Sequence, residues 1–99
     1  HAAFAARTAA LMRTKSPTSL KLVREQMRRG ATLDFAQCMR TEFRIVSRVV
    51  RGHDFYEGIR AVLIDKDQAP HWLPSTLAEV GAAEVERYFA PLARELDLP

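Results

Sequence analysis

The sequence lacks the features that would mark a secreted, membrane-bound or disulfide-rich protein. It has 99 residues and a single cysteine, Cys38, so no disulfide can form within the chain. One thiol fits a reducing compartment, and its place inside a helical pattern favours a small buried hydrophobic residue over a nucleophile. No apolar run approaches the roughly 20 residues that cross a membrane, and no secretory signal opens the chain. We therefore expect no membrane partner.

Signals for β-strands are also missing. No stretch alternates apolar and polar residues as a half-buried strand does. Its composition, 47% hydrophobic and 27% charged, is typical of a globular protein. We predict an all-α fold in one helical region, residues 1–99. The sequence begins inside a helical pattern without an initiator methionine, so we expect it to be a piece of a longer protein.

The spacing of apolar residues and the helix-breaking residues between them predict six helices. Ser16 before Pro17 is typical of a helix start, because serine caps the first turn and proline has no N–H to leave unpaired. Gly30 is predicted to be a C-cap, and Gly52 to end the longest helix. The predicted helices span residues 2–13, 17–29, 33–51, 55–65, 76–80 and 82–89.

Other residues are predicted to cap the later helices. Thr32 is the candidate N-cap of the 33–51 helix, and Ser75 that of the short helix after it in the C-terminal third. Asp54 and Glu57, three residues apart, resemble a capping box for the fourth helix. Gly58, inside that helix, lowers helix stability by about 1 kcal/mol relative to alanine. This glycine indicates either a close contact with another helix or a position without a structural role.

Apolar residues at helical spacing give each long helix a predicted buried face. The predicted faces are Phe4, Leu11 and Met12; Leu20, Val23 and Met27; Ala36, Met39, Phe43, Val46 and Val50; and Phe55, Ile59, Val62 and Leu63. Residues 66–74 are the one irregular stretch, with Trp72 between Pro70 and Pro74. Trp72 is predicted either to pin this loop onto the helices or to form a wall of a ligand pocket.

A row of arginines lies opposite the apolar face of the longest helix. Its members are Arg40, Arg44, Arg48 and Arg51. The row is a solvated face or, alternatively, a phosphate-binding ridge, because arginine forks match phosphate oxygens. The net charge of +3 also allows nucleic acid, but no aromatic residues are interleaved on this face, so we expect no nucleic-acid partner.

The sequence shows no catalytic or metal-binding pattern. Ligand-type side chains gather in the fourth helix and the loop after it, but their spacing matches no known metal motif, so we expect surface polar residues and no metal. These side chains are His53, Asp54, Glu57, Asp67 and His71. No Ser-His-Asp order, glycine-rich phosphate loop or pair of buried carboxylates is present.

Two stretches carry a resemblance to a known family. Residues 15–21 read KSPTSLK, and residues 51–72 read RGHDFYEGIRAVLIDKDQAPHW. Together they resemble the C-terminal part of 3-hydroxyisobutyryl-CoA hydrolases, near relatives of the enoyl-CoA hydratases in the crotonase superfamily. The resemblance covers residues 11–92. The GHDF and IDKDQ segments favour the hydrolase branch, whereas the shorter pattern from Asp54 through Glu57-Gly58 to Ala61 is common to many members of the superfamily.

This resemblance implies that the chain is the C-terminal helical segment of a crotonase-fold enzyme, without the β/α spiral core. In such enzymes the core supplies two backbone N–H groups that form an oxyanion hole, together with the acidic catalytic side chains. Those groups would lie upstream of His1, so we assign no catalytic residue to this chain. No cofactor is implied, since coenzyme A is part of the substrate.

The family's C-terminal helices cover the active site and often make subunit contacts. The implied partners are therefore the N-terminal core of the same protein, an acyl-CoA substrate and, in some cases, further copies of the chain. Val50, Lys66 and His71 fall near the region that contacts coenzyme A, with Lys66 preferred because a flexible ammonium can reach a phosphate. The implied location is the cytoplasm in a bacterium or an organelle matrix in a eukaryote.

Two alternatives stay open. In the first, the chain is the corresponding C-terminal segment of an enoyl-CoA hydratase or isomerase, which would differ from a hydrolase in the missing core rather than in this segment. Otherwise it is an independent helical interaction module. The sequence immediately before His1 would distinguish the two enzyme classes from the module.

Overall fold

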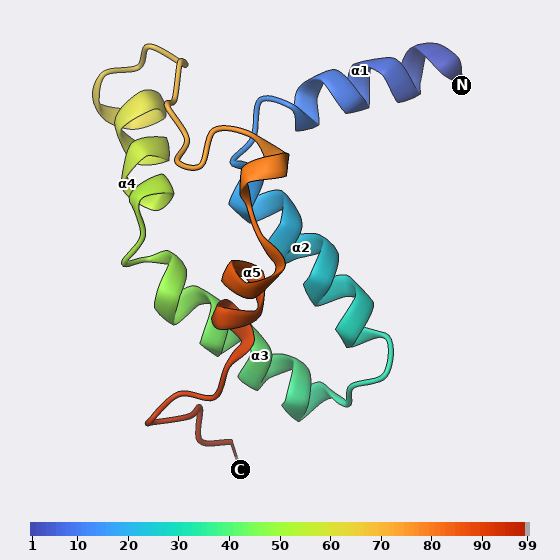
Figure 1. The fold of residues 1–99 in the computed structure, drawn as a ribbon, viewed down its shortest axis with the longest axis vertical. Coiled ribbons are helices and arrows are strands. Elements are labelled where there is room, and N and C mark those ends of the chain that lie inside the picture. Colours follow the sequence, from blue (N-terminus) through green and yellow to red (C-terminus); the bar gives the residue numbers. More distant parts are fainter. Residues whose placement is uncertain (99) are drawn as a thin grey trace.

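The computed structural model describes residues 1–98, and every regular element within them is helical (Figure 1). The predicted all-α fold is thus confirmed. The elements are α1 (Ala2–Met12), α2 (Pro17–Gly30), α3 (Phe35–Val49), α4 (His53–Ile59), the π-helix η1 (Arg60–Ile64), the short 3₁₀ helix η2 (Leu77–Glu79) and α5 (Ala82–Phe89).

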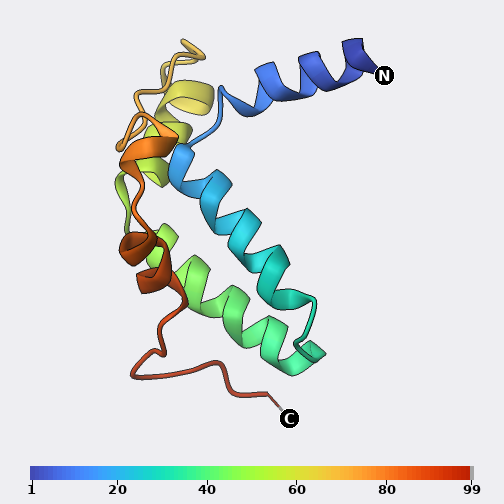
Figure 2. The ribbon, with the colours of Figure 1, turned by 45° about the vertical axis from the view of Figure 1, so that its right-hand side comes forward.

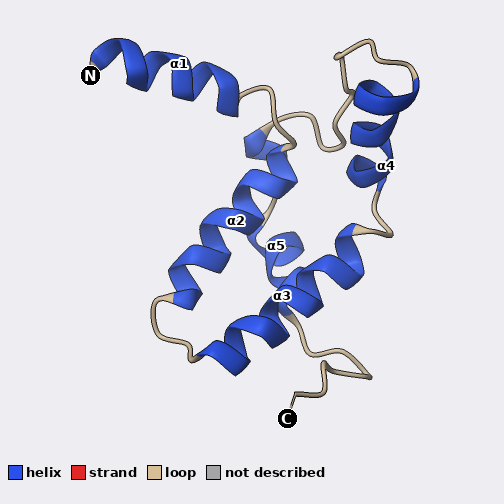
Figure 3. Ribbon diagram, turned by 180° about the vertical axis from the view of Figure 1, so that it is seen from behind, coloured by secondary structure: helices blue, strands red, loops and turns tan. Residues whose placement is uncertain are grey.

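The core is formed where α5 meets both α2 and α3. These two longer helices diverge from a short connecting loop, and α5 lies between them (Figure 3). Leu22 of α2, Ile45 of α3, and Tyr88 and Phe89 of α5 form one buried cluster. Half-buried Val49 and Val85 complete it. The residues that close the core therefore come late in the sequence.

Helix α1 projects away from the rest of the chain and has no buried residue (Figure 2). Its predicted buried face is exposed, with Phe4 at 68% and Leu11 at 60% of their full accessible surface. Alanine-rich α1 has high intrinsic helix propensity, but short helices depend on packing for most of their stability. Within the described chain, the apolar face of α1 therefore has no cover.

The predicted buried faces of α2 and α3 are partly wrong: Leu20 and most of the α3 face are half-buried, but Val23, Met27 and Val46 are exposed. Met27 is 72% exposed and Val23 53%, whereas neighbouring Leu22 is only 3% exposed. On α3, Val46 is 47% exposed and Ile45 is buried. Apolar periodicity shows which faces of a helix are apolar, but not which of them is buried. In this chain the core residues of α2 and α3 are those that face α5. Within residues 1–98, Val23 and Met27 of α2 and Val46 of α3 are left exposed.

Some predicted helix boundaries are confirmed and others are wrong. Ser16 caps α2 as predicted, accepting a hydrogen bond from the Ser19 amide at 3.2 Å. Gly30 is instead the last helical residue, and Ala31 follows as the C-cap in ordinary right-handed geometry. Thr32 does not cap α3, because the chain makes one more turn before that helix begins.

Asp34 is the N-cap of α3, within a full capping box. Its carboxylate accepts the Gln37 amide at 2.8 Å, and the Gln37 side chain accepts the Asp34 amide at 3.0 Å. This reciprocal pair satisfies two N–H groups that the first turn leaves unpaired. Cys38, predicted to be buried, is half-buried on this helix.

The fourth predicted helix is two elements. It begins at His53, capped by Gly52, and passes into the π-helix at Arg60. Ala61 is fully buried, but Val62 and Leu63, predicted to be buried, are 50% and 66% exposed. A π-turn widens the backbone and rotates the side chains that follow it, which moves the predicted face toward the surface.

The C-terminal third matches the prediction at α5 but not before it. The short helix predicted from Ser75 is reduced to the single turn η2, whose N-cap position is held by Thr76. The hydroxyls of both residues donate to the Glu79 carboxylate. Among the described residues, no helix is long and apolar enough to cross a membrane.

Candidate functional site: a pocket and a braced loop

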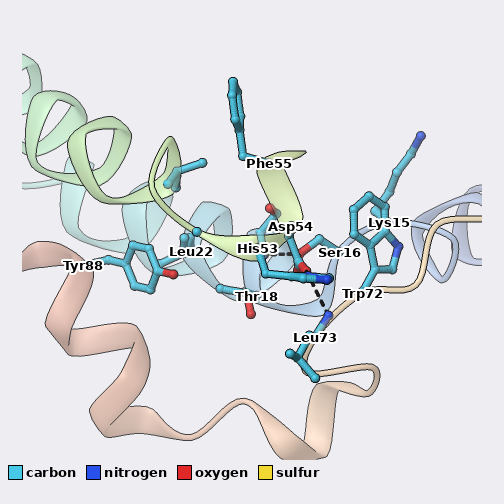
Figure 4. Close-up of a pocket in the computed structure, with 13 residues that line it drawn as sticks. Lys15, Ser16, Thr18, Leu22, His53, Asp54, Phe55, Trp72, Leu73 and Tyr88 are labelled. Carbon is cyan, nitrogen blue, oxygen red and sulfur yellow. Dashed lines mark hydrogen bonds and ion pairs between the residues drawn. The ribbon is translucent and has the colours of Figure 1, made fainter. Parts of the chain in front are cut away.

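An open pocket of about 310 Å³ lies between the start of α2, the start of α4 and α5. Figure 4 shows Trp72 and Leu73 at one end of it and Tyr88 and Leu22 at the other. Most of its lining is apolar, with polar groups from Lys15, His53 and Asp54 among the remainder. An apolar hollow with a few polar groups is the usual form of a small-molecule site, or of a socket for another part of a protein.

Trp72 both fixes its loop and lines this pocket. Its indole Nε1 donates to the Thr14 carbonyl at 3.0 Å, which ties the loop to the turn after α1. The ring also lies against Gly58 of α4, so the close contact inferred for this glycine is with a loop side chain rather than with another helix. The predicted pinning of the loop is thus confirmed, and Trp72 also lines a pocket, whose use as a ligand site stays a prediction.

Asp54 joins three separate segments instead of capping α4. It is the second residue of the helix, and its carboxylate accepts the Ser16 hydroxyl at 2.5 Å and the Leu73 amide at 2.9 Å (Figure 4). His53 Nδ1 lies 2.9 Å from the same carboxylate. The predicted Asp54–Glu57 capping box is wrong, because both carboxylates bind partners far along the chain and Gly52 occupies the N-cap position.

Arg60 is the centre of a second network, and all five of its N–H donors are used. Nε and one terminal nitrogen donate to the two oxygens of Glu57 at 2.8 and 2.7 Å. The other terminal nitrogen donates to Asp65 at 2.9 Å and Asp67 at 2.7 Å. The fifth bond, at 3.4 Å, reaches the Ala69 carbonyl. One guanidinium thus holds a helix turn and the loop that follows it.

Glu57 extends this network to the far end of the loop. The same carboxylate oxygen that pairs with Arg60 also accepts the His71 amide at 2.7 Å. The Arg60 guanidinium, and after it the His71 amide, lower the pKa of Glu57 from 4.5 to about 2. Glu57 raises the pKa of Arg60 in turn, and Arg60 lowers that of Asp67. Glu57, Arg60 and Asp67 are therefore charged at neutral pH.

Residues 65–73, termed the 65–73 loop below, are folded back over the π-helix. The Gln68 amide donates to the Ala61 carbonyl at 3.0 Å. Lys66 and Gln68 have φ values of 55° and 54°, the left-handed region that residues other than glycine rarely adopt. The surrounding hydrogen bonds hold both residues in this conformation. The loop has one defined shape rather than being a simple connection.

The structure brings two of the three predicted coenzyme A residues into one element. Lys66 and His71 are both exposed on the 65–73 loop. Val50 lies apart from them in the chain, as the half-buried C-cap of α3. None of the three lines the pocket described above.

The arginine row of α3 is neither a solvated face nor a phosphate ridge along its length. Arg48 donates to the carbonyls of Tyr88 and Ala90 at 2.9 and 2.8 Å. Arg44 donates to the Phe89 carbonyl at 3.3 Å and forms an ion pair with Glu95. The last turn of any helix leaves carbonyls unpaired, and here two arginines of α3 satisfy those of α5.

Ligand-type residues near α4 do not converge on a metal. No cluster of three or more such side chains with metal-binding geometry occurs within residues 1–98. Glu57 and Asp67 are paired with Arg60 instead. Sequence reasoning missed Arg60 itself, although its position three residues after Glu57 is the spacing of a helical ion pair.

The chain is similar to a known protein family and to curated members of it. Residues 1–89 match the family described as Enoyl-CoA hydratase/isomerase. Curated relatives include "3-hydroxyisobutyryl-CoA hydrolase, mitochondrial" from Gallus gallus, 48% identical over 89 residues, covering 90% of this chain and 23% of the relative. The protein of the same name from Danio rerio is 47% identical over 97 residues, covering 97% of this chain and 25% of the relative.

A solved structure also matches. It is the crystal structure of a Carnitinyl-CoA dehydratase from Mycobacterium thermoresistibile, with a TM-score of 0.85 and 42% sequence identity. The match covers 92% of this chain and 26% of that one. The chain thus spans about a quarter of the length of the proteins that it matches.

Proposed function

Because this chain belongs to the enoyl-CoA hydratase/isomerase family, we propose that it is the C-terminal helical part of a 3-hydroxyisobutyryl-CoA hydrolase, a thioesterase of valine catabolism. The observation that carries the proposal is the identity of 47–48% to two hydrolases along 89 and 97 residues. Fold alone does not separate the reactions of this superfamily, so the sequence of the relatives is the stronger argument.

The role of this segment in the whole protein is to cover the active site and to pack against the core or another subunit. Its uncovered apolar surface supports this role. Phe4 of α1, Met27 of α2 and Phe35 of α3 are each more than 65% exposed, at 68%, 72% and 77%. Apolar surface on three helices favours a large interface over an independent module. The N-terminal core is the first candidate for that partner.

The chemistry is assigned to residues outside this chain. Thioester hydrolysis needs hydrogen-bond donors that stabilise the developing oxyanion and an acidic side chain that activates the attacking water. The acidic side chains of α4 and the 65–73 loop are already bonded within the chain, as Glu57, Asp65 and Asp67 are to Arg60. This segment is therefore inactive alone, and its part in binding is contact with coenzyme A through Lys66, His71 and Val50. A eukaryotic host would place the protein in an organelle matrix, a bacterial one in the cytoplasm.

A hydratase or dehydratase of the same family is the second candidate. The dehydratase structure that matches at a TM-score of 0.85 favours it. Both reactions begin from an acyl thioester whose carbonyl is polarised by the enzyme, and they differ in where water and the acidic groups lie. Those positions belong to the core.

One enzyme preparation distinguishes the two candidates. The protein that contains this segment and its core is assayed for thiol release from 3-hydroxyisobutyryl-CoA and for loss of enoyl absorbance from crotonyl-CoA. We expect thiol release to be the faster reaction. Faster hydration would overturn the hydrolase assignment and leave the family membership intact. The isolated chain serves as the control, and we expect it to release thiol no faster than buffer.

A further inference from the structure

We infer that Arg60 is a positioning residue for coenzyme A binding: it fixes the 65–73 loop that presents Lys66 and His71, and it does not itself bind phosphate. The inference rests on the proposed function, which assigns those two loop residues to coenzyme A. What it adds is the residue that places them.

The first step is the hydrogen-bond capacity of Arg60. A guanidinium has five N–H donors, and all five are already engaged with Glu57, Asp65, Asp67 and the Ala69 carbonyl. Arginine binds phosphate by directing two of these donors at its oxygens. Arg60 has none to spare, so a phosphate would first have to displace a carboxylate.

The second step is what the bonds hold in place. Asp65 and Asp67 flank Lys66, and both carboxylates meet the same guanidinium nitrogen. The backbone of Lys66 is thereby fixed from both sides in its left-handed conformation, with φ at 55°. A residue with a β-carbon adopts this conformation only at an energetic cost, so it persists where neighbouring bonds enforce it.

His71 is held through Glu57. Arg60 orients the Glu57 carboxylate with two bonds, and that carboxylate accepts the His71 amide at 2.7 Å. The Glu57 side chain is only 11% exposed, so solvent does not readily replace these bonds. The two candidate ligands at opposite ends of the loop are therefore placed by one residue.

The third step is charge. Glu57, Asp65 and Asp67 bring three negative charges close to the loop that is to receive an anionic phosphate. Arg60 offsets part of this charge. A neutral replacement would both free the loop and leave three carboxylates to repel the ligand, whereas lysine keeps the charge and loses the fork.

Steady-state kinetics of the core-containing protein test the binding role. We expect Arg60→Gln to raise KM for the acyl-CoA by roughly tenfold, equivalent to one well-placed charged contact, with kcat within about twofold. The KM of Arg60→Lys should lie between those of the wild type and Arg60→Gln, because lysine keeps the positive charge but not the forked hydrogen bonds. Arg87→Gln is the matched control, since Arg87 forms a similar pair with Glu84 three residues away and has no hydrogen bond to the 65–73 loop.

A double-mutant cycle tests whether Arg60 acts through Lys66. If it does, Arg60→Gln combined with Lys66→Gln should raise KM little beyond the more affected single variant. Increases that multiply would mean that the two side chains act independently. That result would overturn the inference.

Hydrogen exchange gives a readout that does not depend on activity. We expect the amides of Gln68, Ala69 and His71 to exchange at least tenfold faster in Arg60→Gln, while those of α2 and α3 are unchanged. Unchanged exchange in the loop would overturn the positioning role. A wild-type protein that neither binds nor turns over acyl-CoA would overturn the proposed function instead, and the exchange result would still stand for the loop.

Discussion

The indole ring of Trp72 lies against the α-carbon side of Gly58, so that a β-carbon added to Gly58 would be 3.4 Å from the ring. That distance is an ordinary van der Waals contact and not a clash. The absence of a side chain at residue 58 lets the loop approach the helix closely, and a single methyl group still fits.

Two substitutions of Gly58 should therefore have opposite effects. Gly58→Ala should stabilise the fold by up to about 1 kcal/mol, because alanine has the higher helix propensity and its methyl group meets the ring. Gly58→Leu should displace Trp72 and break its bond to the Thr14 carbonyl. Fluorescence of Trp72, the only tryptophan, reports the displacement, and chemical denaturation reports the stability. A destabilised alanine variant would contradict the contact geometry.

Asp54→Ala should destabilise the chain by about 1–3 kcal/mol, because it leaves the buried Ser16 hydroxyl and the Leu73 amide without their acceptor. The effect is not loss of a helix cap, since Gly52 holds that position. Urea unfolding measures the change, with Asp97→Ala, at an exposed site, as the control. Equal stability of the two variants would argue against the role of Asp54 as a link between segments.

The Glu57–Arg60 pair predicts a dependence on acid. The pKa of Glu57 is lowered in the folded state from 4.5 to about 2, so its contribution is complete above pH 4.5 and is lost as the pH falls toward 2. Glu57→Gln should accordingly lose more stability at pH 7 than at pH 3. Unfolding curves at the two pH values test this. A loss of equal size at both would mean that the ionised carboxylate is not what Arg60 stabilises.

Arg48 should matter far more than its neighbour Arg51. Arg48→Met removes the donors to the Tyr88 and Ala90 carbonyls and should destabilise the fold by about 1–3 kcal/mol. Arg51→Met, at an exposed site of the same row, should change stability by less than about 0.5 kcal/mol. Thermal unfolding compares them. Similar effects would indicate that α5 is held by its apolar residues alone.

The isolated chain should associate with itself in solution. Phe4, Met27 and Phe35 are exposed on three different helices, and such surface drives association when its natural cover is missing. Sedimentation velocity over a range of concentrations measures this, and circular dichroism should show helix throughout. A monomer at all concentrations with a cooperative, high melting transition would favour an independent module.

Helix positions were largely predictable because they depend on local signals. Ser16 before Pro17 marked the start of α2, and the all-α class followed from the helical spacing and the absence of strand patterns. The errors were in burial and in long-range bonding. Leu22 was missed because a short helix far along the chain selects which face of α2 is covered, and local periodicity holds no information about that.

The site was less predictable for the same reason. Asp54 and Glu57 have the spacing of a capping box, yet their partners include Ser16, Leu73 and His71, which lie far away in the sequence. The arginine row was interpreted as a solvated face or a phosphate-binding ridge, because nothing in α3 indicates that α5 ends beside it. Residue spacing reveals which side chains share a face of a helix, but not what that face meets.

The late position of Tyr88 and Phe89 also bears on synthesis. A ribosome produces α2 and α3 before the two aromatic residues that complete the core with Leu22 and Ile45. Until those residues emerge, Leu22 of α2 and Ile45 of α3 lack the two aromatic side chains that bury them. A premature stop codon before residue 88 would remove both aromatic residues and leave α2 and α3 without the side chains that close their shared core.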